Sequence, residues 1–567
     1  MELSVAQRPA ALETLGRWTF DLVIIGGGIT GASIARAAAL RGYTVALLEQ
    51  DDLGSGTSSR SSRLIHGGLR YLEHGELGLV FESLAERALL ARVARHIVRP
   101  QRFVLPVYKQ DRVGMGQARL GLWLYDTLAL FRNYRRHQSL SAAEAAMQVE
   151  GIRQAGLSGA IAYYDYRTDD SRLVLENILS AVELGAVVAS HARVEGFDRT
   201  ASGVRCVQVH DRLGGARFEV RTRAIMCAAG PWTDGVLGTG RWLRPTKGVH
   251  VVVPRERLAV DNAVVMQHPG DGRVMFVLPF HERTVLGTTD TDFDGDPTSA
   301  VPDARDVSYL LQAAAHYFPG AHLGSDDVIS SWAGVRPLVR APTGVLHSAL
   351  QSGSPTPRAE VDDPSAVSRE HRIETLPGGI VVVAGGKLTT YRRMAAQCLA
   401  AVTRVIAESG GSPSRGPVAG EKGPLPGAMG LEREEQFEAL CQRTVQQIED
   451  QTLAHQLCQT YGVRAQQVVL LMHQRPELAR RLVPELPIVW AQVVFAARHE
   501  LALTLCDVLV RRTQLVYRDA GRGLDVALHA AEVMGDELGW DTVERQRQVE
   551  AYRQLVRTDH PTGREAG

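Results

Sequence analysis

The sequence F-D-L-V-I-I-G-G-G-I-T-G, from Phe20 to Gly31, decides the fold. Its first half is an apolar run typical of a buried parallel strand, and its second half matches the pattern G-x-G-x-x-G. An Ala-rich segment to Leu40 predicts a helix, and residues 44–49 predict a second strand that ends at Glu49. These elements together predict a Rossmann-like βαβ unit that binds a dinucleotide.

The glycines of this unit have separate expected roles. Gly26 permits a tight turn, Gly28 lets a pyrophosphate approach the backbone, and Gly31 lets the helix pack closely on the strand. The helix N-terminus offers unpaired N–H groups to the phosphates, and Glu49 is placed to bind ribose hydroxyls. A purely structural βαβ turn is the alternative, but the complete order of strand, helix, strand and acid favours nucleotide binding.

The fingerprint alone does not distinguish FAD from NAD, and the next segment is the better guide. An NAD-binding domain continues with further strand–helix units after Glu49. Here the chain enters T-S-S-R-S-S-R-L-I-H-G-G-L-R-Y, from Thr57 to Tyr71, which is too polar for a core strand. We interpret this segment as a loop that lies along a bound flavin and delivers Arg70 to an anionic substrate.

The composition is ordinary for a soluble globular protein of 567 residues, with 45% hydrophobic and 22% charged residues. Lys+Arg and Asp+Glu balance at 63 each, so no overall positive field suggests nucleic acid as a partner. Six scattered cysteines without a C-x-x-C pair argue against a disulfide framework and against a zinc or other metal site, and fit a reducing cytosol. We expect neither a signal peptide nor a membrane-spanning helix.

Patterns further along the chain predict additional domains. Short β-branched-rich runs from Lys247 onward predict an antiparallel substrate domain inserted into the nucleotide domain. The predicted fold class is therefore α/β, with a Rossmann-like FAD-binding domain, an inserted antiparallel β cap domain and an all-α C-terminal domain. The expected boundaries are 18–110, 166–245 and 366–410 for the FAD-binding domain, 111–165 and 246–365 for the cap, and 430–556 for the helical domain.

The segment from Arg112 to His137 is apolar first and basic at its end. One interpretation is a helix packed inside the cap domain. The other is an interfacial helix whose basic end lies near lipid headgroups.

Several motifs resemble those of the FAD-dependent glycerol-3-phosphate dehydrogenase family, within the D-amino-acid-oxidase-like flavoproteins. The resemblance extends from Asp21 to about Thr513, and its main departure is Arg63, where the family often has lysine. The motifs that carry it are T-S-S-x-S-S-[KR]-L-I-H-G-G-L-R-Y-L-E-H at Thr57–His74, A-x-G-P-W at Ala228–Trp232, K-G-x-H at Lys247–His250, G-T-T-D at Gly287–Asp290, G-V-R-P-L at Gly334–Leu338 and G-G-K-L-T-T-Y-R at Gly385–Arg392.

The resemblance implies oxidation of sn-glycerol 3-phosphate to dihydroxyacetone phosphate by hydride transfer to FAD, with electrons passed to a membrane quinone. It also implies a cytoplasmic enzyme peripherally associated with the inner face of the cell membrane, and it leaves a homodimer open. A glycerol-3-phosphate oxidase that uses dioxygen and releases hydrogen peroxide is the nearest alternative. Two further alternatives are an amine or amino-acid oxidase and a non-catalytic flavoprotein. The number of cations suited to phosphate argues against the amine or amino-acid oxidase, because the carboxylate of an amino acid needs fewer.

The candidate substrate and catalytic residues come from separate parts of the chain. Guanidinium groups and a lysine suit a phosphate dianion, so the substrate candidates are Arg70, Arg369 and Lys387. Tyr71 is expected to add a hydroxyl contact to the substrate. Arg336 is expected to stabilise the developing alkoxide and is a further phosphate candidate.

The hydroxyl proton is assigned to one of two histidines, His66 or His250. The alternative for each arginine is a surface salt bridge, and for each histidine a structural hydrogen bond. The expected cofactor-binding residues are Gly26, Gly28, Gly31, Glu49, Thr57, Ser58, Ser61, Ser62, Leu64, His66, Gly67, Gly230, Trp232, Gly334, Lys387, Leu388 and Thr389.

Overall fold

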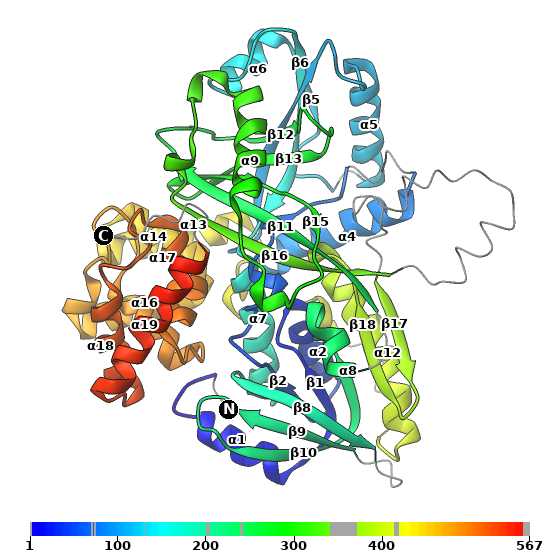
Figure 1. The fold of residues 1–567 in the computed structure, drawn as a ribbon, viewed down its shortest axis with the longest axis vertical. Helices are drawn as coiled ribbons and strands as arrows, with labels where there is room; N and C mark the ends of the chain where they lie inside the picture. The colour runs from blue at the N-terminus through cyan, green and yellow to red at the C-terminus, as the bar shows by residue number, and fades with distance from the viewer. Residues whose placement is uncertain are drawn as a thin grey trace, which may run out of the picture.

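Three bodies are visible in the computed structural model, which describes residues 3–69, 72, 75–130, 132–199, 205–238, 242–340, 371–412 and 419–559 (Figure 1). A nucleotide-binding part surrounds β1 and β2 at the bottom of the view, a cap surrounds a second sheet at the top, and helices α13 to α19 form a body at one side. The predicted α/β fold class with a cap and a helical C-terminal domain is confirmed.

Strand β1 (Thr19–Ile25) lies at the centre of the first sheet, whose order is β17-β18-β10-β1-β2-β7. It pairs in parallel with β2 (Val45–Leu48) and β10 (Arg217–Cys227). Every β1 residue after Asp21 is buried, because parallel strands are covered on both faces. The other strands of this sheet are β7 (Val187–Ala189), β8 (Ala192–Arg199), β9 (Arg205–Asp211), β17 (Arg372–Leu376) and β18 (Ile380–Ala384).

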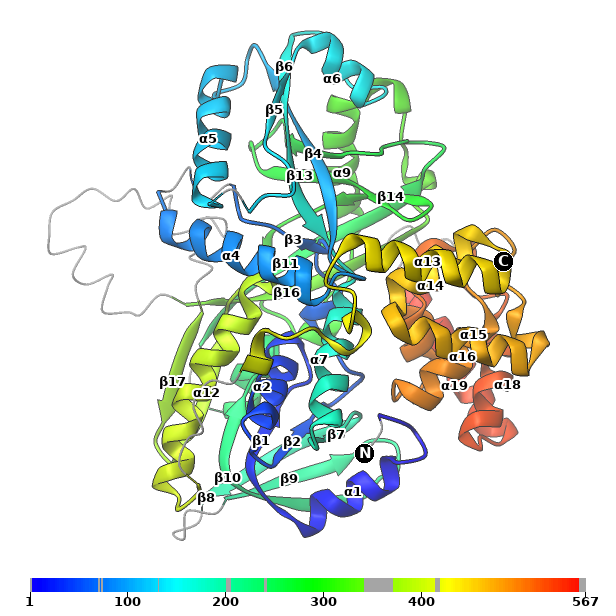
Figure 2. The same ribbon diagram turned by 180° about the vertical axis from the view of Figure 1, so that it is seen from behind.

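Helix α2 (Ile29–Leu40) follows β1 directly and contacts α7 (Asp170–Glu183) and α12 (Tyr391–Glu408), and the three helices lie side by side in Figure 2. The turn before it depends on glycine, because Gly26 has φ +109° and a Cβ there would lie 2.5 Å from the Ala228 carbonyl oxygen. The strand–turn–helix unit therefore forms as the sequence predicts. Helix α1 (Arg8–Arg17) lies against β7 and β10.

The second sheet has the order β15-β11-β14-β13-β12-β4-β6-β3 and forms the cap. Strands β3 (Leu64–Ile65) and β4 (Arg99–Tyr108) pair with β6 (Leu157–Arg167) in this sheet. The predicted boundary at residue 110 is therefore too late, because the β4–β6 ladder places residues 99–108 in the cap. The remaining strands are β5 (Gln138–Leu140), β11 (Leu243–Pro254), β12 (Ala263–Gln267), β13 (Val274–Phe280), β14 (Arg283–Gly287), β15 (Thr291–Asp292) and β16 (Ser330–Val339).

Helices border the cap and the boundary between the two sheets. The cap side carries α4 (Leu77–Val93), α5 (Met115–Leu128), α6 (Ala142–Gln148) and α9 (Ala304–Tyr317), and the short helix α8 (Thr233–Leu237) follows β10. The C-terminal body contains α13 (Glu434–Ile448), α14 (Gln451–Tyr461), α15 (Ala465–Gln474), α16 (Trp490–His499), α17 (Leu515–Arg518), α18 (Ala527–Leu538) and α19 (Thr542–Thr558).

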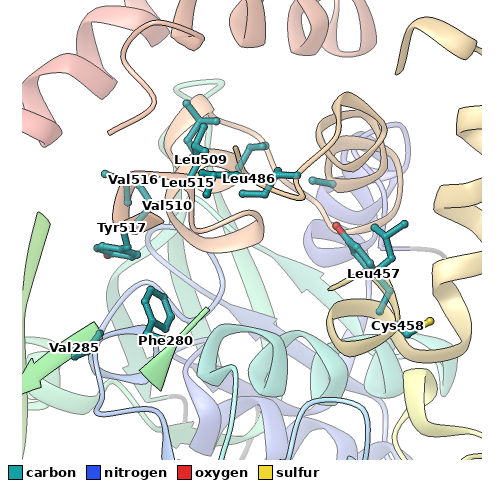
Figure 3. Packing of buried hydrophobic residues seen from close by; sticks show 14 of the residues in the cluster. Phe280, Val285, Leu457, Cys458, Leu486, Leu509, Val510, Leu515, Val516 and Tyr517 are labelled. Atoms are coloured by element: carbon teal, nitrogen blue, oxygen red, sulfur yellow. The ribbon is translucent and has the colours of Figure 1, made fainter. Parts of the chain in front are cut away.

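The helical body packs onto both other bodies. Figure 3 shows Phe280 of the cap near Tyr517 of the helical body, and both belong to one buried hydrophobic cluster. Toward the nucleotide-binding part, the buried Arg512 guanidinium donates to both Asp52 carboxylate oxygens, at 2.7 and 2.8 Å, and Arg511 pairs with the same carboxylate. The helical domain is therefore an integral part of the fold.

Candidate active site

A cavity of about 1250 Å³ is lined by residues of both sheets. The nucleotide-binding part contributes the fingerprint turn and the end of β2, and the cap contributes β11 and β16. Segments far apart in the chain thus meet at one site.

The fingerprint turn fits a pyrophosphate. The N-terminus of α2 lies at the cavity wall, which includes Gly26, Gly28, Ile29 and Thr30. The Ile29 N–H donates to the Ser58 hydroxyl oxygen at 2.9 Å, which fixes the polar loop against this helix terminus. A helix N-terminus with glycine backbone around it is an anion-binding environment.

Glu49 fits the role of a ribose ligand. One of its carboxylate oxygens accepts from the Gly27 N–H at 2.6 Å, and the other accepts from the Asp51 N–H at 2.9 Å. These bonds hold the carboxyl group at the cavity wall, where each oxygen keeps a lone pair for a hydroxyl. Burial raises its pKa from 4.5 to about 7, against the opposing effect of the two backbone hydrogen bonds.

The polar loop is tied to the cap strand β16 and to α7. The Thr57 hydroxyl donates to the Val335 carbonyl at 2.6 Å, and the Arg60 guanidinium donates to the Ala333 carbonyl at 3.0 Å. The Ser61 hydroxyl donates to Asp170 at 2.7 Å, and burial raises the pKa of this carboxyl to about 6. The loop is thus held by both bodies that form the cavity.

Arg63, the residue at which the chain departs from the family motif, does not line this cavity. Its backbone has φ +57°, and its guanidinium lies 4.5 Å from the centroid of the Phe280 ring and 4.9 Å from that of Trp332. It also donates to Gln514 of the helical body. The cation therefore anchors the loop to the C-terminal domain.

The two candidate histidines have different surroundings. His250 is buried, stacks on Trp332 with ring centroids 4.9 Å apart, and has its Nε2 2.8 Å from the Ser62 hydroxyl oxygen. Burial, together with Arg336 and Arg63, lowers the pKa of His250 to about 3, so the ring is neutral and weakly basic at pH 7.

His66 is half-buried at the cavity wall. Its backbone N–H donates to the Thr389 hydroxyl oxygen at 3.2 Å, and that hydroxyl donates back to its carbonyl at 3.2 Å. The Thr389 side chain thus fixes the backbone of His66 at the cavity wall.

Arg336 is the cation that the cap brings to the cavity. It sits on β16, and its guanidinium donates to Asp290 at 2.9 Å, to the Thr288 hydroxyl at 3.1 Å and to the Thr289 carbonyl at 3.2 Å. These contacts engage both terminal nitrogens and orient the guanidinium, and the residue lines the cavity. Lys387, from the turn after β18, also lines it.

Most of the predicted residues meet at this site. Gly31, Gly67 and Thr389 do not lie on the wall: Gly31 packs against the Gly26 carbonyl, the Gly67 N–H donates to the Tyr125 hydroxyl at 2.9 Å, and Thr389 holds His66. Arg70, Tyr71 and Arg369 lie outside the described residues. The predicted residues on the wall are Gly26, Gly28, Glu49, Thr57, Ser58, Ser61, Ser62, Leu64, His66, Gly230, Trp232, His250, Gly334, Arg336, Lys387 and Leu388.

Other parts of the wall were not predicted from the sequence. Arg60 belongs to the polar loop, so its position in that motif was the available signal. An apolar extension toward α5, with Leu105, Val107, Leu120 and Leu124, carries no motif that distinguishes it from a core segment.

The chain is similar to flavin-dependent proteins over nearly its whole length. Residues 21–389 match a family model described as FAD dependent oxidoreductase, and residues 418–545 match one described as the C-terminal domain of alpha-glycerophosphate oxidase. The aerobic glycerol-3-phosphate dehydrogenase of Staphylococcus saprophyticus is 32% identical over 568 residues, which cover 96% of each chain. The protein of the same name from Staphylococcus aureus is 32% identical over 578 residues, which cover 98% of this chain and 97% of that one.

Solved structures show the same similarity. The glycerol-3-phosphate dehydrogenase of Bacillus halodurans, complexed with FAD, superposes with a TM-score of 0.79 at 28% identity and covers 100% of both chains. The L-alpha-glycerophosphate oxidase of Mycoplasma pneumoniae superposes with a TM-score of 0.52 at 17% identity, covering 72% of this chain and 99% of that one. The second comparison concerns the fold alone.

Proposed function

The chain belongs to the FAD-dependent oxidoreductase family, and we propose that it oxidises sn-glycerol 3-phosphate to dihydroxyacetone phosphate and passes the electrons to a membrane quinone. The observation that carries the proposal is Arg336, a guanidinium held by Asp290 at the wall of a cavity whose other end suits a dinucleotide. The names of the relatives support the choice of substrate.

FAD, when bound, would supply the acceptor for the hydride that is removed from C2 of the substrate. Arg336 has the position and charge to stabilise negative charge on the C2 oxygen, because Asp290 orients it before the substrate binds. Lys387 is placed to attract the phosphate, and we expect Arg70 and Arg369 to join it.

We assign the C2 hydroxyl proton to His66. A group that accepts a proton at neutral pH must have adequate basicity, and His250, with a pKa of about 3, lacks it. His250 instead holds the Ser62 hydroxyl through Nε2, so we give it a positioning role.

Helix α5 supports the membrane and quinone parts of the proposal. Its side chains Leu120 and Trp123 are 66% and 59% exposed, while Ala118 and Leu122 on the other side of the helix are buried. Both interpretations of this segment thus find support, since the helix packs on the cap and also presents apolar residues to the surroundings. The same helix borders the apolar extension of the cavity, which suits a quinone that enters from a lipid surface.

No helix in the described part of the chain has the length and apolarity to span a bilayer. Exposed Arg132, Arg135 and Arg136 follow α5, and such cations favour anionic lipid headgroups. We therefore propose peripheral association with the inner face of the cell membrane.

The activity is tested by anaerobic mixing of the FAD-loaded protein with sn-glycerol 3-phosphate. Flavin absorbance should bleach, and a soluble quinone should restore it faster than dioxygen does. Hydrogen peroxide formed at the rate of substrate turnover would instead assign the oxidase activity, and unchanged absorbance would reject both.

Membrane association is tested by sedimentation with vesicles that contain anionic phospholipid. The double variant Leu120→Ser, Trp123→Ser should lose binding, and Leu528→Ser on the distant α18 is the matched control, because that side chain is also 57% exposed. Equal binding of both variants would remove α5 as the membrane contact.

A further inference from the structure

A second recess, of about 480 Å³, lies outside the active-site cavity and is lined mainly by basic and aromatic side chains. It lies where the β4–β6 ladder meets the turn between β13 and β14. We call it the arginine cleft, and the residues that matter are Arg102, Arg135, Tyr164, Arg167, Arg255 and His281.

The cleft carries more positive than negative charge. Arg255 pairs with the 88% exposed Asp261 side chain at 2.5 Å, which is the one carboxylate on the described wall. Arg102 donates to the neutral Gln138 side chain at 3.0 Å, while its Nε is buried without a hydrogen-bond partner. Arg135 is exposed beside the Tyr134 ring, 5.7 Å from its centroid.

Arg167 is the central observation. Among the described residues, its guanidinium makes no hydrogen bond or ion pair, and the group that most affects it electrostatically is another cation, Arg99. Burial and this neighbour lower the pKa of Arg167. Arg167 is half-buried, its strongest charged neighbour is another cation, and three further arginines line the same recess, so the cleft suits a ligand that supplies negative charge.

His281 adds no charge to the cleft. Burial and three arginines, Arg518, Arg167 and Arg63, lower its pKa well below the ordinary value, so the ring is neutral at pH 7. The guanidinium groups and the Tyr164 hydroxyl are donors of the kind that bind phosphate oxygens. The volume of the recess leaves room for an organic group attached to the phosphate.

The cleft is separate from the active-site cavity. Arg167 and His281 also line a hollow of about 80 Å³, which reaches the polar loop at Ser62 and Leu64. Those two residues have the active-site cavity on their other side. The arginine cleft and the active-site cavity share no lining residue, and the small hollow lies between them.

We propose that the arginine cleft is a second anion site, which binds a phosphate group carried by a soluble phosphate ester or by a phospholipid headgroup. This site is independent of the proposed substrate chemistry. The two sources share the same recognition, and they are distinguished by experiment.

Titration of the FAD-loaded protein with inorganic phosphate at low ionic strength tests the site. Arg167→Gln removes the unpaired charge without breaking an ion pair, so it should fold and should weaken phosphate binding at the cleft by about tenfold or more. Over the phosphate concentrations that saturate the wild-type cleft, calorimetry should then detect one phosphate fewer per chain in the variant. Arg305→Gln is the control, because that side chain is 96% exposed on α9, outside the cleft.

Arg102→Gln is the second variant and should reduce the same binding event. Turnover of sn-glycerol 3-phosphate should keep its KM in both variants. Equal phosphate stoichiometry in the wild type and Arg167→Gln would overturn the site, and so would a KM that rises in parallel with the loss, because the cation would then serve the substrate cavity.

Vesicle sedimentation separates the two sources. Vesicles of phosphatidylcholine alone and of phosphatidylcholine with phosphatidylglycerol are compared for the wild type and Arg167→Gln. A loss of phosphate binding with unchanged vesicle binding assigns a soluble phosphate ester. A parallel loss on the anionic vesicles assigns a lipid headgroup.

Discussion

The two walls of the active-site cavity differ in the groups that they offer to a ligand. The nucleotide wall uses main-chain groups, at Gly26 to Gly28 and the N-terminus of α2, whose geometry is set by backbone angles. The cap wall uses side chains, Arg336 and His250, whose positions are set by neighbouring polar groups. Changes on the first wall should therefore alter retention of the cofactor, and changes on the second should alter turnover.

The largest expected effect is on the cap wall. Arg336→Ala should lower the rate of anaerobic flavin reduction by about 10²–10³-fold, because a preorganised donor to the C2 oxygen is lost. The FAD content of the protein should not change. Arg244→Ala is the control, because Arg244 pairs with Asp292 on the same sheet and does not line the cavity. An unchanged rate of reduction in Arg336→Ala would contradict the assigned role.

The next effect is on the nucleotide wall. Gly26→Ala forces a side chain into a backbone with φ +109° and toward the Ala228 carbonyl. Strain of about 1–3 kcal/mol should weaken FAD binding by roughly 5–150-fold, while protein saturated with FAD keeps its turnover. FAD release on gel filtration measures the affinity, and Gly16→Ala, which meets no atom within 4 Å, is the control. A loss of turnover at full FAD occupancy would show that the two walls are not separable.

A smaller effect is expected for the second histidine of the cap wall. His250→Gln should lower kcat by less than about tenfold, because a neutral amide can replace the neutral ring in its contact with Ser62. The dependence of kcat on pH should keep its midpoint between about pH 5 and 9, since a group with a pKa of about 3 does not titrate there. His66→Gln should reduce kcat further. A midpoint that shifts in His250→Gln would assign the proton to His250.

The last expected effect is a small shift in the unfolding temperature, and it concerns Glu49 in the FAD-free protein. Its folded pKa of about 7 exceeds its ordinary 4.5, so the folded state binds more protons between these values. This contribution to stability is fully present below about pH 4.5 and is lost as pH rises through about 7. The free energy of unfolding of the wild type should therefore fall by on the order of 3 kcal/mol at most between these pH values, which corresponds to roughly 2 °C in the unfolding temperature. Glu49→Gln should not show this fall. Parallel melting curves of wild type and variant against pH would contradict the shift.

The sequence motifs predict the main chain of the site better than its side-chain environments. The spacing of Gly26, Gly28 and Glu49 predicts the nucleotide wall because each role follows from local backbone geometry. The family resemblance predicts that His66 and Arg336 belong to one site, and in the fold both residues line one cavity. These residues therefore lie where their motifs place them.

Other features depend on contacts that no local pattern reveals. The turn of Arg63 away from the cavity requires Phe280, Trp332 and the helical body. The low pKa of His250 arises from burial by a distant strand. The early start of the cap depends on the pairing of β4 with β6. Each of these is a property of packing between segments.

The bond between Arg63 and Gln514 has a consequence for the synthesis of the protein. The two residues are 451 positions apart, so the loop that borders the flavin acquires its anchor only when most of the chain has left the ribosome. At the usual pace of translation this interval lasts roughly 20–90 s. During that time the βαβ unit of β1, α2 and β2 is complete in sequence, while the polar loop after it has no C-terminal partner. Cofactor capture should therefore follow the emergence of the last helices.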